Sequence, residues 1–289
     1  MLQEILDYKN ALKKEFNGKK IDLSLFIKVL NENKSKINSV KLNRKFTNYL
    51  HATLVACYLE KTKYDLNNWQ EYFSEVDSIS DILNVDTPNE WDVFEYFALH
   101  SINQVFDFSV SGLEIKAFIP NNNRKPLYLT DDSFKTNVLS KIENNLILES
   151  IKVKMKIRGL NPKSIWGDND IIVCVKHNNQ FQHFCIISCK LSLRERVYQS
   201  IFWALHSRLE GTGRHVFLTA DKGIKGKTEI GSRNILDKSA KKSRNALEST
   251  MDRVYVLRNE NEVNRSQVIK NFERLKIDLI IWADDILGI

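Results

Sequence analysis

The sequence predicts an α/β (α+β) fold, in which a mixed β-sheet flanked by helices follows a helical N-terminal region. Residues 1 to about 110 carry apolar side chains at helical spacing, with polar gaps between the segments. After residue 133, short apolar runs alternate with helical segments, which is typical of a sheet covered by helices. The chain has 289 residues, of which 43% are hydrophobic and 27% charged, so it can bury a proper core.

The first region is expected to consist of helices with a linker after it. The run Asn121-Asn122-Asn123-Arg124-Lys125-Pro126 is the strongest linker signal in the chain, because Asn and Pro favour turns. It predicts a boundary between a helical region of residues 1–120 and a second domain of residues 127–289. The helices expected before it cover 2–16, 23–33, 40–59, 69–73 and 91–105.

The second domain is expected to alternate strands and helices, after one or two weak strands within 106–119. A helix is predicted over 133–149, because Val138, Ile142 and Leu146 recur on one side. Residues 151–157 alternate with lysines, which predicts a half-exposed strand with a basic face. The other elements predicted are strands at 171–175, 184–187, 215–219, 254–257 and 279–282, and a helix at 266–276.

Two of these strands, 171–175 and 184–187, are expected to pair antiparallel. Both are largely apolar, as strands covered on both faces are, and the residues between them are polar and turn-prone. A turn near Asn178 and Asn179 would place the start of the first strand beside the end of the second.

Three ionisable side chains stand at those strand ends. Asp168 and Asp170 precede the first strand and Lys190 ends the second, so the pairing would bring them together. Two carboxylates and a strand carbonyl, for which Cys189 is the candidate, make an oxygen site suited to Mg²⁺. The lysine can orient or deprotonate a water, or neutralise charge on a phosphate. The alternative is that all three are ordinary polar residues at strand ends, which is the better interpretation of the acids taken alone.

A helix is predicted directly after the lysine. Ser192 and Glu195 form an S-x-x-E capping box, and apolar residues follow at helical spacing. Arg194 and Arg196 would lie in the first turns, where the helix dipole disfavours cations, so they are expected to bind an anion or a base edge. Glu195 can accept a hydrogen bond from cytosine N4, or it serves only as a cap. The buried side is expected to contain Leu193, Val197, Ile201, Ala204, Leu205 and Leu209.

The segment as a whole resembles a known enzyme family. An aspartate followed by S-C-K-x-S-L-R-E-R-x-x-Q, here at residues 188–199, is similar to the active-site and recognition segment of type II restriction endonucleases of the PD-(D/E)xK superfamily. The resemblance is closest to the branch that cuts sites containing CC and GG. It implies Lys190 as the catalytic lysine, Asp168 or Asp170 as metal ligand, and Mg²⁺ as the cofactor. The readers of C:G pairs that it implies are Arg194, Glu195 and Arg196.

The chain departs from this family at two positions. Ser188, two residues before the lysine, stands where the superfamily carries an acid and is kept as a candidate catalytic residue, since the branch often has a small residue there. The branch regains its acid thirteen residues after the lysine, where this chain has Trp203. Glu143 on the predicted preceding helix is the candidate replacement, with a solvated surface glutamate as the alternative. The choice between Asp168 and Asp170 stays open, because the first follows a glycine and the second directly precedes the strand.

Positive charge is concentrated in one block of the chain. The net charge is +7, and residues 222–244 hold eight basic residues against two acidic ones, which makes +6 for the block. Its start is rich in glycine and serine and is expected to contact DNA phosphates through Lys222, Lys225 and Lys227. For residues 238–244 a solvated helix face is a comparable alternative.

The expected protein is a cytoplasmic homodimer that hydrolyses phosphodiester bonds in double-stranded DNA. A palindromic site containing CC and GG follows from the resemblance, and a palindrome requires a two-fold protein. Residues 1–120 are then a scaffold, dimerisation or DNA-contact region, and residues 127–289 form the catalytic and recognition domain. No secretion signal or membrane-spanning run is visible, and the four cysteines are expected to be buried free thiols. The alternatives are a structure- or damage-specific nuclease of the same fold and a catalytically inactive DNA-binding protein.

Overall fold

The chain divides into two compact units. One comprises residues 1–101 with 132–134, and the other residues 102–131 with 135–289. The computed structural model describes residues 28, 74, 90–121, 128–130, 139–156, 158–193, 196–211, 213–221, 228–231, 242–257 and 266–288.

The predicted linker at 121–126 does not coincide with the division between the units. Strand β1 (Ile115–Asn121) leads into it and pairs antiparallel with β5 (Ile171–His177) in the sheet of the second unit. The division falls between residues 101 and 102, because this pairing ties the segment before the linker to the second unit. The functional roles predicted for the two regions stay predictions.

Helix α6 (Glu90–His100) and a π-helical turn after it (Ser101–Val105) confirm the helix predicted over 91–105. The helices predicted earlier in the chain lie almost entirely outside the described residues. The face of α6 that is buried includes Val93, Phe94 and Phe97.

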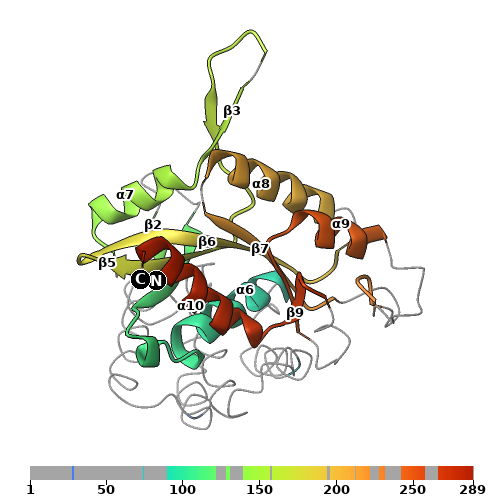
Figure 1. The fold of residues 1–289 in the computed structure, drawn as a ribbon, viewed down its shortest axis with the longest axis horizontal. Coiled ribbons are helices and arrows are strands. Elements are labelled where there is room, and N and C mark those ends of the chain that lie inside the picture. Colours follow the sequence, from blue (N-terminus) through green and yellow to red (C-terminus); the bar gives the residue numbers. More distant parts are fainter. Residues whose placement is uncertain are drawn as a thin grey trace. The chain divides into compact units, whose positions relative to one another are not determined.

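The second unit is built on a mixed sheet with the strand order β2-β1-β5-β6-β7-β8-β9 among the described residues (Figure 1). Along this order, the neighbours from β2 through β1 and β5 to β6 pair antiparallel, and those from β6 through β7 and β8 to β9 pair parallel. This arrangement confirms the predicted fold class. The remaining strands are β2 (Tyr128–Thr130), β6 (Gln180–Lys190), β7 (Arg214–Thr219), β8 (Val254–Val256) and β9 (Ile269–Asn271).

Helices pack on this sheet through two apolar clusters. Helix α7 (Lys141–Ser150) buries Ile147 and Leu148 against residues of β1, β5 and β6. Helices α8 (Arg196–Glu210) and α9 (Lys242–Thr250) share a second cluster with the parallel strands, which includes Val197, Leu247 and Phe217. These two clusters fix the helices that flank the ends of β5 and β6.

A two-residue turn sets the register of the central hairpin. Asn178 and Asn179 have φ angles of 48° and 62°, and both are positive as a type I′ turn requires. The register pairs His177 with Gln180 and Ile171 with Ile187, apart from a shift near Val173. The predicted antiparallel pairing is therefore confirmed, and the start of β5 lies beside the end of β6.

A small second sheet consists of β3 (Val153–Met155) and β4 (Lys163–Ile165), paired antiparallel. This hairpin projects beyond the sheet and helices of the second unit (Figure 1). It confirms the basic strand predicted within 151–157.

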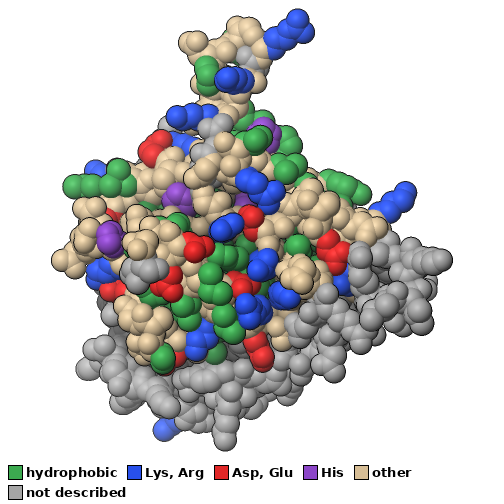
Figure 2. All heavy atoms as spheres, viewed as in Figure 1, with side chains coloured by type: hydrophobic (Ala, Val, Ile, Leu, Met, Phe, Trp, Pro, Cys, Tyr) green, Lys and Arg blue, Asp and Glu red, His purple; other side chains and the backbone are tan. Residues whose placement is uncertain are grey.

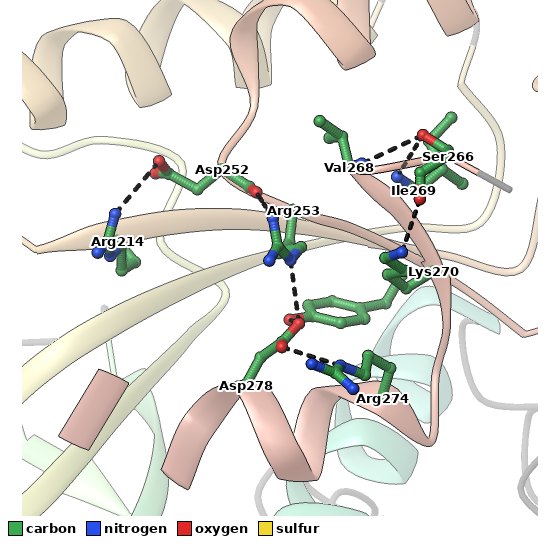
Figure 3. A network of polar contacts seen from close by, with 10 residues as sticks. Arg214, Asp252, Arg253, Ser266, Val268, Ile269, Lys270, Arg274 and Asp278 are labelled. Carbon is green, nitrogen blue, oxygen red and sulfur yellow. Dashed lines mark hydrogen bonds and ion pairs between the residues drawn. The ribbon is translucent and has the colours of Figure 1, made fainter. Parts of the chain in front are cut away.

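A buried polar network fastens helix α10 (Arg274–Leu287) to β8 (Figure 3). Asp278 of α10 accepts hydrogen bonds from the Tyr255 hydroxyl at 2.8 Å and from Nε of Arg253 at 3.1 Å. Its other oxygen accepts from Nε of Arg274 at 3.1 Å. The Asp278 network, comprising these four residues, holds the last helix in place.

Three sequence predictions of secondary structure are wrong. The segment 279–282 is part of α10 rather than a strand, and 266–276 contains β9 rather than one helix. Short apolar runs fit either element, but burial of Leu275, Leu279 and Trp282 follows helical spacing. In the helix predicted over 133–149, residues 139 and 140 are not helical, because Ser140 is the N-cap of a helix that starts at Lys141; residues 133–138 lie outside the described residues.

The expectations about membrane-spanning segments and about cysteines can be compared with the described residues. Within them, no helix combines the length and apolarity needed to cross a bilayer. Cys174, Cys185 and Cys189 are buried free thiols, as predicted.

Candidate active site

The predicted meeting of two carboxylates and one amine is confirmed at the end of β6. Lys190 Nζ lies 2.7 Å from Oδ2 of Asp170 and 3.0 Å from Oδ2 of Asp168. The backbone N–H of Cys189 donates to the same Asp170 oxygen at 2.7 Å. The hairpin register produces this contact, because it sets the residue before β5 opposite the last residues of β6. We call Asp168, Asp170 and Lys190 the site cluster.

The site cluster is largely withdrawn from solvent. The side chains of Asp168, Asp170 and Lys190 are 15%, 17% and 9% exposed. Burial raises the pKa of the Asp170 carboxyl; Lys190 opposes this and the Asp168 charge adds to it. Burial alone would lower the pKa of Lys190, but the two carboxylates outweigh it and raise that pKa above its ordinary value. Lys190 is therefore an ammonium at neutral pH.

The residues present fit a hard divalent cation. Two carboxylate oxygens lie within 3.0 Å of one nitrogen, so they converge on a single point. Mg²⁺ is commonly held by one or two carboxylates, with water and substrate phosphate completing its shell. No group of three or more His, Cys, Asp or Glu side chains that could hold a metal occurs in the described part of the chain. The role predicted for the Cys189 carbonyl stays a prediction.

Ser188 holds the backbone beside the site rather than supplying an acid. Its hydroxyl donates to the Asp168 carbonyl at 2.8 Å and lies 2.9 Å from Nε2 of His215. Since the hydroxyl proton goes to the carbonyl, Nε2 of His215 is the protonated nitrogen. Burial lowers the pKa of His215 to about 4, so the ring is neutral. Sequence reasoning missed His215, because an isolated histidine in an apolar strand carries no signal.

Helix α8 faces the site cluster with neutral side chains. The Ser200 hydroxyl lies 3.5 Å from Oδ2 of Asp168. Trp203 packs on the backbone of Gly167, where an added Cβ would lie 3.3 Å from the indole. The position at which the resembling branch carries an acid is therefore near the site, but an indole occupies it.

The stripe predicted for this helix is only partly buried. Leu193, Val197, Ile201 and Ala204 are buried, whereas Leu205 and Leu209 are 40% and 80% exposed. The prediction is wrong for the last two, because each four-residue step turns the position by about 40° around the helix, and the buried face continues through Ala204 and Ser207 instead.

Glu143 does not join the site. It forms a capping box with Ser140, and its other oxygen accepts from the N–H of Phe181 at 3.2 Å. Phe181 precedes Lys190 by nine residues along β6, which is about 30 Å in a strand. The hydrogen bond from Ser140 lowers the pKa of Glu143, as expected for a cap. The S-x-x-E pattern at 140–143 was a signal that could have identified this role.

Comparisons of sequence point to one class of enzyme. The family described as BsaWI restriction endonuclease type 2 matches residues 147–278. A relative from Methanocaldococcus jannaschii, described as "Putative type II restriction enzyme MjaVIP", is 29% identical over 174 residues. That match covers 58% of this chain and 73% of the relative. The matches support a type II site-specific endonuclease.

One solved structure of a restriction endonuclease has a similar fold. The crystal structure of a specific AgeI–DNA complex has a TM-score of 0.50 and 12% identity, and the match covers 91% of this chain and 93% of that chain. A pre-specific BsaWI–DNA complex matches with a TM-score of 0.36 and 13% identity, over 99% and 92% of the two chains. The AgeI likeness agrees with the predicted fold, and endonucleases of this kind generally use a divalent metal ion.

The two segments predicted to contact DNA each follow the end of a parallel strand. Lys190 of β6 pairs with Thr219 of β7, so both strands finish at the same edge of the sheet. Helix α8 follows one strand and the basic block follows the other. Arg196 is exposed at the start of α8. The other predicted DNA contacts, Arg194, Glu195, Lys222, Lys225 and Lys227, lie outside the described residues.

The described residues that flank these two segments contact each other. The N–H of Leu193 donates to the Glu229 carboxylate. Asp221 Oδ1 accepts from the backbone N–H of Glu229 at 2.7 Å and of Ile230 at 2.9 Å, which closes the intervening loop at its base. Sequence reasoning missed Asp221, although an aspartate just before a glycine- and lysine-rich loop is a common loop-closing residue.

Proposed function

We propose that this protein is a Mg²⁺-dependent type II restriction endonuclease, acting as a homodimer on a short palindromic site that contains CC and GG. The observation that carries the proposal is the site cluster: two partly buried carboxylates contact one lysine at the edge of a nuclease-like sheet. The names of the matching family and relative support the same activity. The CC and GG content comes from the resemblance of residues 188–199.

Asp168 and Asp170 are the proposed metal ligands. A divalent cation held by their oxygens would stabilise the negative charge added to the scissile phosphate when water attacks phosphorus. Asp170 is fixed for this role by the Cys189 N–H, and Asp168 by the hydrogen bond from Ser188 to its carbonyl. Both hydrogen bonds come from residues of β6, so they hold the two proposed ligands in fixed positions relative to each other.

Lys190 is proposed to act as a cation and hydrogen-bond donor. Its Nζ lies 2.7 Å and 3.0 Å from the oxygens of the two proposed metal ligands, so it stands beside the position where a bound phosphate would lie. It can donate to a phosphate oxygen or orient the attacking water while neutralising developing charge. Deprotonation of the attacking water by Lys190 is the other role left open by the sequence, and the same position beside the two carboxylates allows it.

The decisive experiment is cleavage of plasmid DNA with Mg²⁺, followed by sequencing of the ends. Discrete fragments that share one palindromic sequence are expected. Lys190→Ala should lower the cleavage rate by on the order of 10²–10³-fold while DNA binding is retained. Lys176→Ala is the matched control, because Lys176 pairs with Glu114 on the same sheet and should cut normally. Normal cutting by Lys190→Ala would remove the lysine from the mechanism.

Base reading is assigned to the start of α8. Arg194→Ala is expected to cost about 1–3 kcal/mol of discrimination at one C:G position, because a bidentate contact to guanine is lost. The measurement is the ratio of cleavage rates for duplexes with the proper and the altered base pair. An unchanged ratio would refute the reading role of this arginine.

Two alternative activities would give different results in these experiments. Trp203 near the site and Ser188 at the acid position favour a catalytically inactive DNA-binding protein, which would shift a duplex without cutting it. A structure- or damage-specific nuclease would nick branched or damaged substrates and leave intact plasmid whole.

A further inference from the structure

The β3–β4 hairpin is a charged arm whose function the site does not explain. Residues 153–165, here called the arm, contain four basic residues and no acidic one. All four are exposed, and Figure 2 shows Lys and Arg side chains along the projecting segment. The basic residues of the arm are Lys154, Lys156, Arg158 and Lys163.

The arm has a firm base and a solvated tip. Val153 at its base is buried, and Trp166 just after it packs against the cluster beneath α7. Lys152 lies over the Trp166 ring at 5.8 Å and pairs with Glu149. Beyond the base, the described residues from 158 to 164 are exposed. A two-stranded hairpin with so little burial is marginal on its own, so a partner surface would account for it.

The arm leads directly into the active site. Its last residue, Ile165, precedes Asp168 by three positions, which limits their separation to about 11 Å along the chain. Strand β3 also lies beside α8, the helix that starts at the predicted base-reading residues. A ligand bound at the site cluster would therefore lie close to the base of the arm.

We propose that the arm binds the phosphate backbone of the DNA duplex next to the cleavage site. Its charge is complementary to a duplex, which carries one negative charge per ~1.7 Å of axis. The seven residues from Val153 to Gly159 would span about 20 Å in extended form, enough to reach roughly six base pairs along the duplex. The arm contributes affinity and position, whereas base recognition stays with α8. This inference rests on the proposed function, because it presumes a DNA substrate.

The test compares two pairs of charge-removing substitutions. Lys156→Gln with Arg158→Gln neutralises the arm, and Lys141→Gln with Lys276→Gln removes the same charge elsewhere in the second unit. Binding of a duplex containing the cleavage site is measured without metal, so that no cutting occurs, across a range of salt concentrations. Each phosphate contact adds about 0.9 to the slope of log affinity against log salt. The arm pair should reduce the slope by about 1.8, and the control pair should leave it near the wild-type value.

The outcomes separate this inference from the proposed function. If the wild-type protein binds DNA and the arm pair shows the same salt slope, the proposed role of the arm is wrong but the proposed function stands. An equal reduction of the slope in the arm pair and the control pair leads to the same conclusion. A change in preference between the proper and a scrambled site overturns a backbone-only role. If sedimentation without DNA shows that the arm pair forms a smaller species than the wild-type protein, the arm is a contact between copies of the chain. That result would also overturn the DNA-binding role. Failure of the wild-type protein to bind any duplex removes the proposed function itself.

Discussion

The site cluster and the Asp278 network are both buried carboxylate clusters of the second unit, and their charge balance differs. Asp168 and Asp170 share the single ammonium of Lys190, which leaves an excess negative charge. Asp278 instead faces two guanidinium groups and a buried hydroxyl, so every charge of its carboxylate is matched (Figure 3). The Asp278 carboxylate is fully paired, whereas the two site-cluster carboxylates share one ammonium and could be further neutralised by a second cation.

Among the substitutions that test this difference between the two clusters, Asp170→Asn is expected to have the largest effect on the cleavage rate. Cleavage should fall by on the order of 10²–10³-fold, because one of two metal-binding oxygens is replaced by a weaker ligand. Stability should change by less than about 1 kcal/mol, since a desolvated carboxylate with a raised pKa is removed while Lys190 keeps Asp168. Plasmid cleavage and urea unfolding measure the two quantities. Full activity would show that the excess charge has no role.

The next effect concerns acid stability through His215. Its folded pKa of about 4 lies below the ordinary value of 6.5, so the unfolded chain takes up the proton first as the pH falls. The stabilisation is complete above pH 6.5 and is lost progressively towards pH 4, by up to about 3 kcal/mol. His215→Asn should flatten this part of the curve of unfolding free energy against pH. An equally steep curve in the variant would assign the acid sensitivity to other groups.

A smaller effect is expected for Asp278→Asn, the counterpart in the satisfied network. It should lower the free energy of unfolding by about 2 kcal/mol, because charged hydrogen bonds are lost. Arg253 and Arg274 are 31% and 41% exposed and can turn to water, which limits the cost. The folded variant should cleave DNA at the wild-type rate. A lower rate at equal folded fraction would tie this network to catalysis.

Local sequence was sufficient to predict the site cluster. The acids and the lysine are about twenty residues apart and are joined by one hairpin, whose two-residue turn fixes the register. The pattern of apolar strands around Asn178 and Asn179 therefore specified which side chains would meet. The helix after Lys190 was predicted separately, from its apolar spacing.

The parts that sequence did not predict depend on distant contacts. His215 reaches Ser188 only through parallel pairing of β6 with β7, which needs the intervening helix to be placed first. Ser200 approaches Asp168 through packing of α8. The misassigned run 279–282 lacked tertiary context, since four apolar residues suit a strand or a buried helix face equally.

Asp221 has a consequence for how such enzymes can diversify. Its carboxylate joins the two feet of the loop that carries Lys222, Lys225 and Lys227, and it does so through backbone N–H groups at 229 and 230. Those bonds do not depend on which residues lie between the feet, and doubling a loop's length costs only about 0.6 kcal/mol. If this segment contacts DNA as proposed, insertions and substitutions between the two anchored ends could change which DNA is bound while Asp168, Asp170 and Lys190 keep their arrangement.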